Sequence, residues 1–232
     1  MKEKGKIILG IESSTTVCSV AMGIGEKIIA VREIEDGKFH SEFLHGFVAE
    51  VMIEAGLHWN DLDAVAVSKG PGSYTGLRIG VSAAKGYCYA LGIPLIGVDT
   101  LQAMARKAKV KFSSAEIENL CPMLDARRME VYTAIYNYEL EIRMPVKALV
   151  LEESQCRGYF PENKIAFFGN GMPKAKEFLS VTVKNALFID DLQPSATEIV
   201  QMAMQKLDCG QIENTAYFEP YYLKEFIGKK II

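Results

Sequence analysis

The sequence of 232 residues predicts an α/β protein built of two lobes. Three observations favour this fold class. Short β-branched segments separated by turn residues open the chain, which is typical of a meander of strands. Helical periodicity and strand-like runs then alternate, as in sheets covered by helices. A weaker copy of the same plan follows in the second half, without readable residue identity to the first.

The first half contains five expected strands and three expected helices. The strands are expected at residues 6–11, 17–23, 27–33, 62–67 and 94–98. The helices are expected at residues 41–56, at about 75–92 and at 101–108. Leu44, Val48 and Val51 recur at helical spacing in the first helix, and Gly56 marks its end. A three-strand meander followed by alternating helices and strands matches the ribonuclease H-like half of actin-like proteins.

The second half gives weaker signals of the same kind. Strands are expected at residues 120–123, 130–137, 148–151 and 164–168, and helices after residue 171 and at 195–207. The predicted fold is therefore actin-like (the ASKHA fold), with two ribonuclease H-like lobes of which the second is reduced. The segment AKVKFSS breaks the pattern, so we expect one lobe at residues 1–109 and a smaller lobe with a tail at 110–232.

Composition and charge restrict the function. The net charge is −3 and no basic run is visible, which argues against a protein that grips a nucleic-acid backbone alone. The five cysteines are scattered and never spaced CxxC, which favours reduced intracellular thiols. No apolar run approaches the ~18 residues of a membrane span, and the start is unlike a signal peptide. We expect a soluble cytoplasmic protein.

Four segments are candidate phosphate loops: SKGPGSYTGLRIG, ESSTT, LDARRMEVY and GNG. The segment SKGPGSYTGLRIG fits neither the Walker A nor the GxGxxG spacing, so a strand-to-helix turn is favoured over phosphate binding. The turn ESSTT occupies the place where actin-like kinases hold phosphate and magnesium. In LDARRMEVY, Asp125 with Arg127 and Arg128 either clamps a phosphate or pairs internally. The candidate vestigial phosphate-loop residues are Glu12, Ser13, Ser14, Thr15, Gly70, Gly72, Asp125, Gly169 and Gly171.

Two helices of the first half carry more apolar surface than one sheet needs. The helix after the glycine-rich segment is small or apolar on nearly all sides, and the helix before it has a second apolar stripe. The two helices therefore either pack on each other or form a protein–protein surface. The candidate partner-interface residues are His40, Phe43, Phe47, Gly76, Arg78, Gly80 and Ala84.

Catalytic and metal-binding patterns are missing from the sequence. His40 and His45 are five residues apart, which does not form an i, i+4 metal pair. No nucleophile elbow occurs, and no cysteine has a recognisable catalytic context. We therefore assign no catalytic and no metal-binding residue. The tail FEPYYLKEFIGKK combines four aromatic residues with three lysines and is expected to dock on its own lobe or on a partner.

The segments ILGIESSTTVCSVA, SKGPGSYTGLRIGVSAAKG, GVDTLQAMA, LDARRMEVY, GNG and PYYLK occur in this order. Together they resemble the bacterial TsaB (YeaZ) family. The resemblance implies a non-catalytic scaffold and activator, the dimerisation subunit of the machinery that places threonylcarbamoyl on an anticodon-loop adenosine of tRNA. It implies pairing through helices of the first lobe, either with the catalytic paralogue TsaD or as a homodimer.

The resemblance also implies further partners and departures. The ATPase TsaE is an expected partner, and tRNA would be met only through the complex. We expect no cofactor on this chain alone, with ATP or ADP at a complex interface. The His-x-x-x-His metal motif of TsaD corresponds here to Thr100 and Met104, which implies no metal chemistry. Lys224 stands where the family's tail usually has arginine after Tyr-Leu, which reduces a bidentate contact to a single charge.

Two enzymatic alternatives remain. An actin-like ATP-binding small-molecule kinase or ATPase would need nucleotide loops and a carboxylate base, for which Glu12 and Asp125 are the candidates. A metallo-glycoprotease would need a metal site, which Thr100 and Met104 disfavour.

Overall fold

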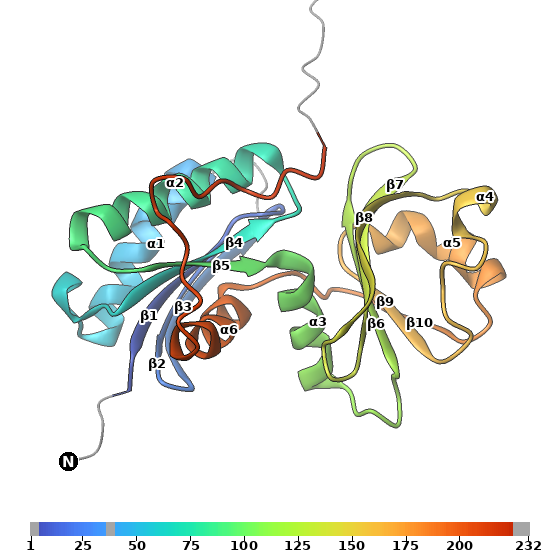
Figure 1. Cartoon of the computed structure of the whole chain (residues 1–232), viewed down its shortest axis with the longest axis horizontal. Helices are drawn as coiled ribbons and strands as arrows, with labels where there is room; N and C mark the ends of the chain where they lie inside the picture. Colours follow the sequence, from blue (N-terminus) through green and yellow to red (C-terminus); the bar gives the residue numbers. More distant parts are fainter. Residues whose placement is uncertain (1–4, 36–39, 225–232) are drawn as a thin grey trace, which may run out of the picture.

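The computed structural model describes residues 5–35 and 40–224, arranged as two lobes that each contain a five-stranded sheet (Figure 1). The first sheet has the order β3-β2-β1-β4-β5 and the second the order β8-β7-β6-β9-β10. In each sheet, the first three strands in sequence pair antiparallel and the last two join in parallel. The same topology therefore occurs twice, and the predicted actin-like α/β fold class is confirmed.

The first lobe contains every element expected from the first half of the sequence. Its strands are β1 (Ile7–Glu12), β2 (Val17–Ile24), β3 (Lys27–Glu35), β4 (Ala64–Gly70) and β5 (Leu95–Asp99). Its helices are α1 (His40–Ala55), α2 (Tyr74–Leu91) and α3 (Thr100–Lys111), with a short 3-10 helix at Trp59–Asp61. The predicted bounds differ from these by a few residues at most. Periodic patterns with clear turn residues on both sides were sufficient here.

The second lobe differs more from the prediction. Its strands are β6 (Asn119–Asp125), β7 (Glu130–Asn137), β8 (Ile142–Val150), β9 (Ile165–Phe168) and β10 (Ala186–Ile189). Its helices are α4 (Glu153–Cys156) and α5 (Met172–Thr182), and α6 (Ala196–Asp208) follows. The strand predicted at 148–151 is only the end of β8. β10 was not predicted, because four residues are too few to show an alternating pattern.

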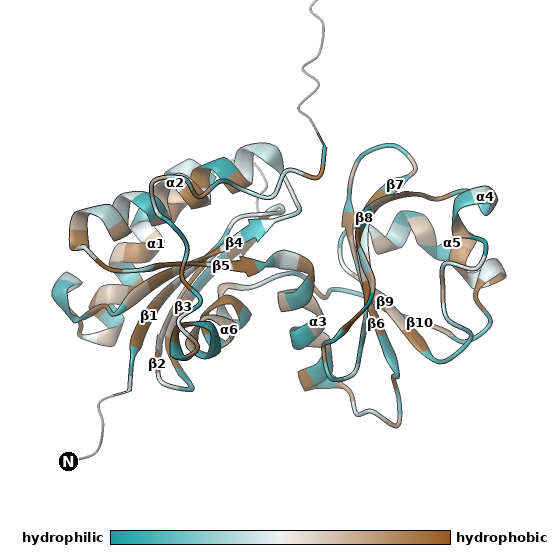
Figure 2. Ribbon diagram, viewed as in Figure 1, coloured by the Kyte–Doolittle hydropathy of each residue, from teal (hydrophilic) through white to brown (hydrophobic). Residues whose placement is uncertain are grey.

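Helix α6 packs on the first sheet, although the predicted boundary assigned it to the second lobe. Its apolar side lies against β1 and β2, on the face opposite α1 and α2 (Figure 1). The strands of this sheet are mostly hydrophobic (Figure 2). Val200 lies directly over Gly10 and Gly23, where a Cβ would collide with it. The second face of the sheet is apolar, and α6 covers it. For this reason α6 belongs to the first lobe in space, although it follows the second lobe in sequence. The boundary at residues 109/110 otherwise stays a prediction.

The tail after α6 returns across the first lobe to the second. The Glu213 amide donates to the Leu95 carbonyl at 2.8 Å, and the Tyr221 amide donates to the Lys69 carbonyl at 2.6 Å. Phe218 is buried in the core of the first lobe, and Lys224 pairs with Glu130 of the second lobe. The predicted docking is confirmed up to Lys224; Phe226, Lys229 and Lys230 lie outside the described residues. Within the described ranges, no helix has the length and apolar character to cross a bilayer.

Candidate functional site

The glycine-rich segment 68–80 ends β4, begins α2 and wraps around the turn at residues 12–15. The Ser73 amide donates to the Ser14 carbonyl at 2.6 Å, and the Ser13 hydroxyl donates to the Gly76 carbonyl at 2.9 Å. A Cβ at Gly76 would lie closer than 3.0 Å to Ser13, a distance that real Cβ atoms do not adopt. The same holds for Gly72 against Ser14 and for Gly80 against Ser13. The glycines therefore serve close packing of α2 on this turn.

Four of the predicted partner-interface residues are buried inside the chain and were predicted wrongly. Gly76, Gly80 and Ala84 are buried within the chain, so the small side of α2 is used by the protein itself. His40 is also buried, and its Nε2 lies 3.2 Å from the Val17 carbonyl oxygen, where it fixes the start of α1 to β2. These four residues present no surface to a partner. The sequence pattern had located the small residues of α2 but not the side that faces the sheet.

Glu12 occupies the centre of the turn and is completely buried. The Ser14 amide donates to its Oε1 at 2.6 Å. Burial raises the pKa of the Glu12 carboxyl above its ordinary value, because the charged form loses its water. Glu12 Oε2 and the hydroxyls of Ser14, Ser68 and Thr100 are buried without a hydrogen-bond partner in the described part of the chain. The Ser14 amide, a donor that a bound phosphate would use, is thus already bonded to the Glu12 carboxylate.

The phosphate-loop candidates of the second lobe are filled in a similar way. The Asp125 amide donates to Asn170 Oδ1 at 2.9 Å, and the Asp125 carboxylate pairs with Lys174. The Gly171 amide donates to the Met123 carbonyl at 3.0 Å. Among described residues, no hydrogen bond or ion pair joins this group to the turn at residues 12–15. The structure brings the candidates together within each lobe but not across the two lobes.

Helices α1 and α2 both carry apolar side chains that are exposed or partly exposed. The Phe43 and Phe47 rings stack with centroids 5.7 Å apart, and both are partly exposed. Tyr87 of α2 connects the helices, since its hydroxyl lies 2.7 Å from His45 Nδ1 and its ring stacks on Trp59 at 5.5 Å. We call this the α1–α2 surface; it comprises Phe43, Gly46, Phe47, Ile53, Ala83, Gly86, Tyr87 and Tyr89.

Two glycines of the α1–α2 surface were not among the predicted site residues. A Cβ added at Gly46 or Gly86 would meet nothing within 4 Å. Ile53 and Tyr89 nearby in sequence are 80% and 88% exposed. A glycine inside a helix costs about 0.5–1 kcal/mol relative to alanine, and here no contact within the chain requires it. An exposed helix glycine with apolar neighbours was the signal in the sequence that could have found them.

Arg78, the last predicted interface residue, belongs to the tail side of α2. Its guanidinium lies 5.4 Å from the centre of the Tyr74 ring, and its Nη1 donates to the Tyr74 hydroxyl at 3.4 Å. The Tyr222 ring of the tail lies 4.8 Å from the same ring. Arg78 is exposed and lies on the same side of α2 as Tyr89, three helical turns away.

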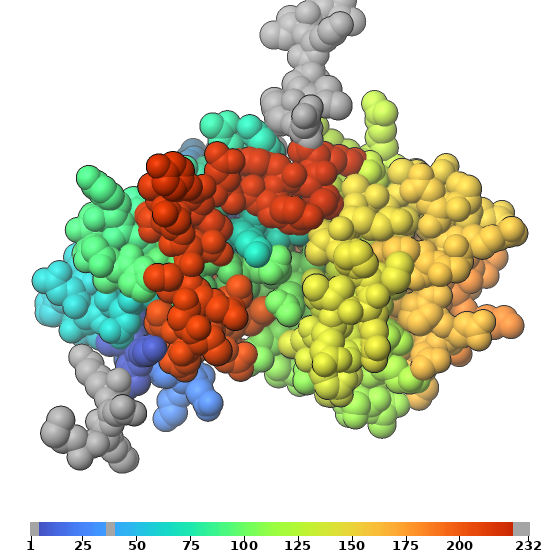
Figure 3. All heavy atoms as spheres, viewed as in Figure 1, coloured from blue at the N-terminus to red at the C-terminus, as the bar shows by residue number. Residues whose placement is uncertain are grey.

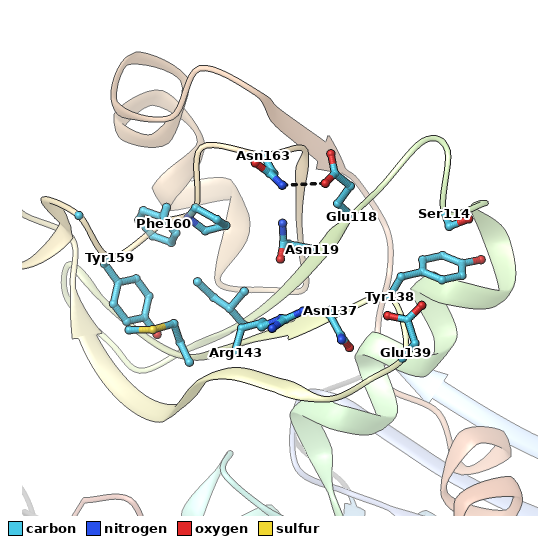
Figure 4. A pocket seen from close by; sticks show the side chains of 14 residues that line it. Ser114, Glu118, Asn119, Asn137, Tyr138, Glu139, Arg143, Tyr159, Phe160 and Asn163 are labelled. Atoms are coloured by element: carbon cyan, nitrogen blue, oxygen red, sulfur yellow. Dashed lines mark hydrogen bonds between the residues drawn. The ribbon is translucent and has the colours of Figure 1, made fainter.

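Two pockets among the described residues were not predicted from the sequence. One, of about 600 Å³, lies in the second lobe and is lined mainly by polar side chains (Figure 4). Asn163 Nδ2 donates there to Glu118 Oε2 at 2.7 Å, and Asn137 bonds Glu141 through both ends of its amide. The other, of about 650 Å³, lies between the lobes beneath the tail, next to the Lys69–Asp99 ion pair.

Metal-binding groups do not cluster in the described part of the chain. No set of three or more histidine, cysteine, aspartate or glutamate side chains there could hold a metal ion. Thr100 and Met104, at which the family resemblance implies the loss of a metal motif, are both buried.

These features define an actin-like α/β protein in which the chain's own groups bond part of the phosphate-loop positions and the first two helices carry exposed apolar side chains. A family model described as "TsaD: tRNA N6-adenosine threonylcarbamoyltransferase" matches residues 34–207. The Bacillus subtilis protein named "tRNA threonylcarbamoyladenosine biosynthesis protein TsaB" is 34% identical, over 86% of this chain and 87% of that protein. The Haemophilus influenzae protein of the same name is 29% identical, over 97% of this chain and 96% of that protein. The structure of YeaZ from Pseudomonas aeruginosa superposes with a TM-score of 0.80 at 24% identity, covering 94% of this chain and all of that one. The chain belongs to the TsaB (YeaZ) family.

Proposed function

We propose that this chain acts in the biosynthesis of threonylcarbamoyladenosine in tRNA, as a non-catalytic scaffold and activator of the catalytic paralogue TsaD. The names of its relatives support the pathway. The observation that carries the role is the contrast between the two kinds of site. The polar turns hold hydrogen bonds or ion pairs to the chain's own groups, whereas the apolar α1–α2 surface is exposed or partly exposed.

The α1–α2 surface has the properties of a helix-packing interface. Packed helices lie 8–10 Å apart, and small residues at the contact allow the shorter distances. Gly46 of α1 and Gly86 of α2 provide such positions on the helices that carry the aromatic side chains of Phe43, Phe47 and Tyr87. In the proposed complex, α1 and α2 form a four-helix bundle with the equivalent helices of TsaD. Burying these faces favours the active arrangement of the TsaD site.

The remaining partners follow from the same proposal. The isolated chain would pair with itself through the α1–α2 surface, TsaE would join the complex, and tRNA would be bound by the complex. ATP or ADP would sit at an interface of the complex. The kinase alternative is less well supported, because Glu12 is completely buried and the Asp125 carboxylate already pairs with Lys174.

Threonylcarbamoylation of tRNA by TsaD, measured with and without this chain, tests the proposal. We expect activity only when the chain is present. Gly86→Glu should abolish both pairing and stimulation, because Gly86 faces open space and the chain should still fold. Val181→Glu is the matched control, since Val181 is 88% exposed on α5 of the other lobe. Full activity of TsaD alone, or magnesium-dependent ATP turnover by this chain alone, would refute the proposal.

A further inference from the structure

The loop between β6 and β7 carries two arginines in an unusual backbone conformation. Arg127 and Arg128 have φ values of 68° and 45°, in the left-handed region that residues other than glycine rarely adopt. Such conformations persist only where the surrounding structure imposes them, and they gather at binding and active sites. The loop stands at the top of the second lobe, beside the last described residues of the tail (Figure 1).

The second lobe holds this loop from beneath. Lys174 donates to the carbonyl oxygens of Arg128 and Glu130 at 2.8 and 2.6 Å and also pairs with the Asp125 carboxylate. The Arg127 amide donates to Asp125 Oδ1 at 3.0 Å. These contacts use the backbone of the loop, and both arginine side chains are exposed.

The charges of the loop are not balanced. Its two acids are each taken by a lysine from a distant part of the chain, Asp125 by Lys174 and Glu130 by Lys224. Within residues 5–35 and 40–224, the side chains of Arg127 and Arg128 make no ion pair or hydrogen bond, and both are exposed. The loop therefore presents two uncompensated guanidinium groups on a chain whose net charge is −3.

Aromatic rings lie close to these arginines. Lys224 Nζ lies 5.9 Å from the centre of the Tyr132 ring, and the charge of Arg127 acts on the Tyr132 phenol. Tyr222, two residues before Lys224 in the tail, is exposed and packs on Tyr74 of α2. In the space-filling view, atoms of the β6–β7 loop (yellow-green) protrude from the surface near the described end of the tail (red) (Figure 3).

We propose that Arg127 and Arg128 form an RNA-contacting site on this chain, in which the two guanidinium groups bind the phosphate backbone. The proposal rests on the proposed function and adds that this chain touches tRNA itself. Guanidinium binds phosphate through paired hydrogen bonds, and its plane also stacks on unstacked bases of RNA. An acidic protein surface would fit the charge but offers no base for the guanidinium planes.

Binding of labelled, unmodified tRNA to the full chain tests this site. The variant R127N/R128N removes both charges, and asparagine tolerates the left-handed backbone, so the loop keeps its shape. We expect affinity at low salt to fall about tenfold, as for the loss of two exposed ion pairs. The slope of log K against log salt should fall by about 1.4, because each single-strand phosphate contact contributes about 0.7. R127K/R128K should bind with intermediate affinity.

A charge-matched control separates the site from net charge. R143Q/K184Q removes two exposed cations at the opposite end of the second sheet and should bind tRNA like the unaltered chain. The proposal is overturned if the unaltered chain does not bind tRNA at low salt, or if both double variants lose affinity equally. It is also overturned if polyglutamate of equal charge competes as well as RNA, which would indicate an acidic protein partner. None of these outcomes affects stimulation of TsaD through the α1–α2 surface, which is measured separately.

Discussion

Replacing Gly86 with alanine should stabilise the isolated chain and weaken its pairing. The new Cβ meets nothing within 4 Å, so the folded chain accepts it without strain. Alanine is favoured over glycine inside a helix by about 0.5–1 kcal/mol. For a chain of this size, that gain corresponds to a rise in melting temperature of about 2 °C. Thermal unfolding at a concentration below that of self-association measures it.

The effect on pairing has the opposite sign. If a partner helix lies against Gly86, an added methyl group overpacks the contact, which typically costs about 1–3 kcal/mol. Association with TsaD should therefore become at least about fivefold weaker, since about 1.4 kcal/mol corresponds to a factor of ten. Isothermal titration of TsaD with the chain and its variant measures the difference.

Gly76→Ala on the same helix is the matched control. A Cβ there would lie closer than 3.0 Å to the Ser13 carbonyl oxygen, a backbone atom of a buried turn that cannot move aside. We expect this variant to lose about 3 kcal/mol of unfolding free energy. Unchanged pairing of Gly86→Ala would refute the assignment of the interface, and unchanged stability of Gly76→Ala would refute the account of the turn.

Three further predictions concern the buried acid and the tail. Burial raises the pKa of the Glu12 carboxyl in the folded chain above its ordinary value of 4.5. The free energy of unfolding should therefore fall as the pH rises above 4.5, because ionised Glu12 is disfavoured in the fold. Glu12→Gln should remove this fall, and urea unfolding should show it to be the more stable form at neutral pH. Phe218→Ala should cost about 3 kcal/mol and expose the tail to limited proteolysis, whereas Tyr217→Ala, at an 83% exposed residue, should do neither. Lys224→Ala breaks a partly exposed ion pair with Glu130, so thermal unfolding should reveal a loss of less than about 1 kcal/mol.

The elements of the first lobe could be predicted because each has its own period and clear ends. The role of each small residue in α2 could not. Gly76 and Gly86 are ten residues apart, which places them on different sides of a helix of 3.6 residues per turn. Only the position of the turn at residues 12–15 decides that Gly76 faces inward and Gly86 outward. The sequence period therefore shows which residues share a side of a helix, but not what that side packs against.

The placement of α6 illustrates the same limit at longer range. Its own pattern predicted a helix with one apolar side, and that prediction is confirmed. The sheet face that it covers includes Gly10 and Gly23, which lie far away in the sequence and admit Val200 only because they lack side chains. A division of the chain by sequence position cannot represent a segment that returns to the first lobe.

The β6–β7 loop depends on such distant contacts for its charge. Read locally, its two acids and two arginines would neutralise one another, and the sequence left that alternative open. Lys174 and Lys224, 49 and 94 residues from their partners, take the two acids and leave the arginines exposed. Because Lys224 belongs to the tail, the net charge around the loop depends on whether the tail is docked. A variant that releases the tail would free the Glu130 carboxylate, and we expect it to weaken RNA binding although no arginine has changed.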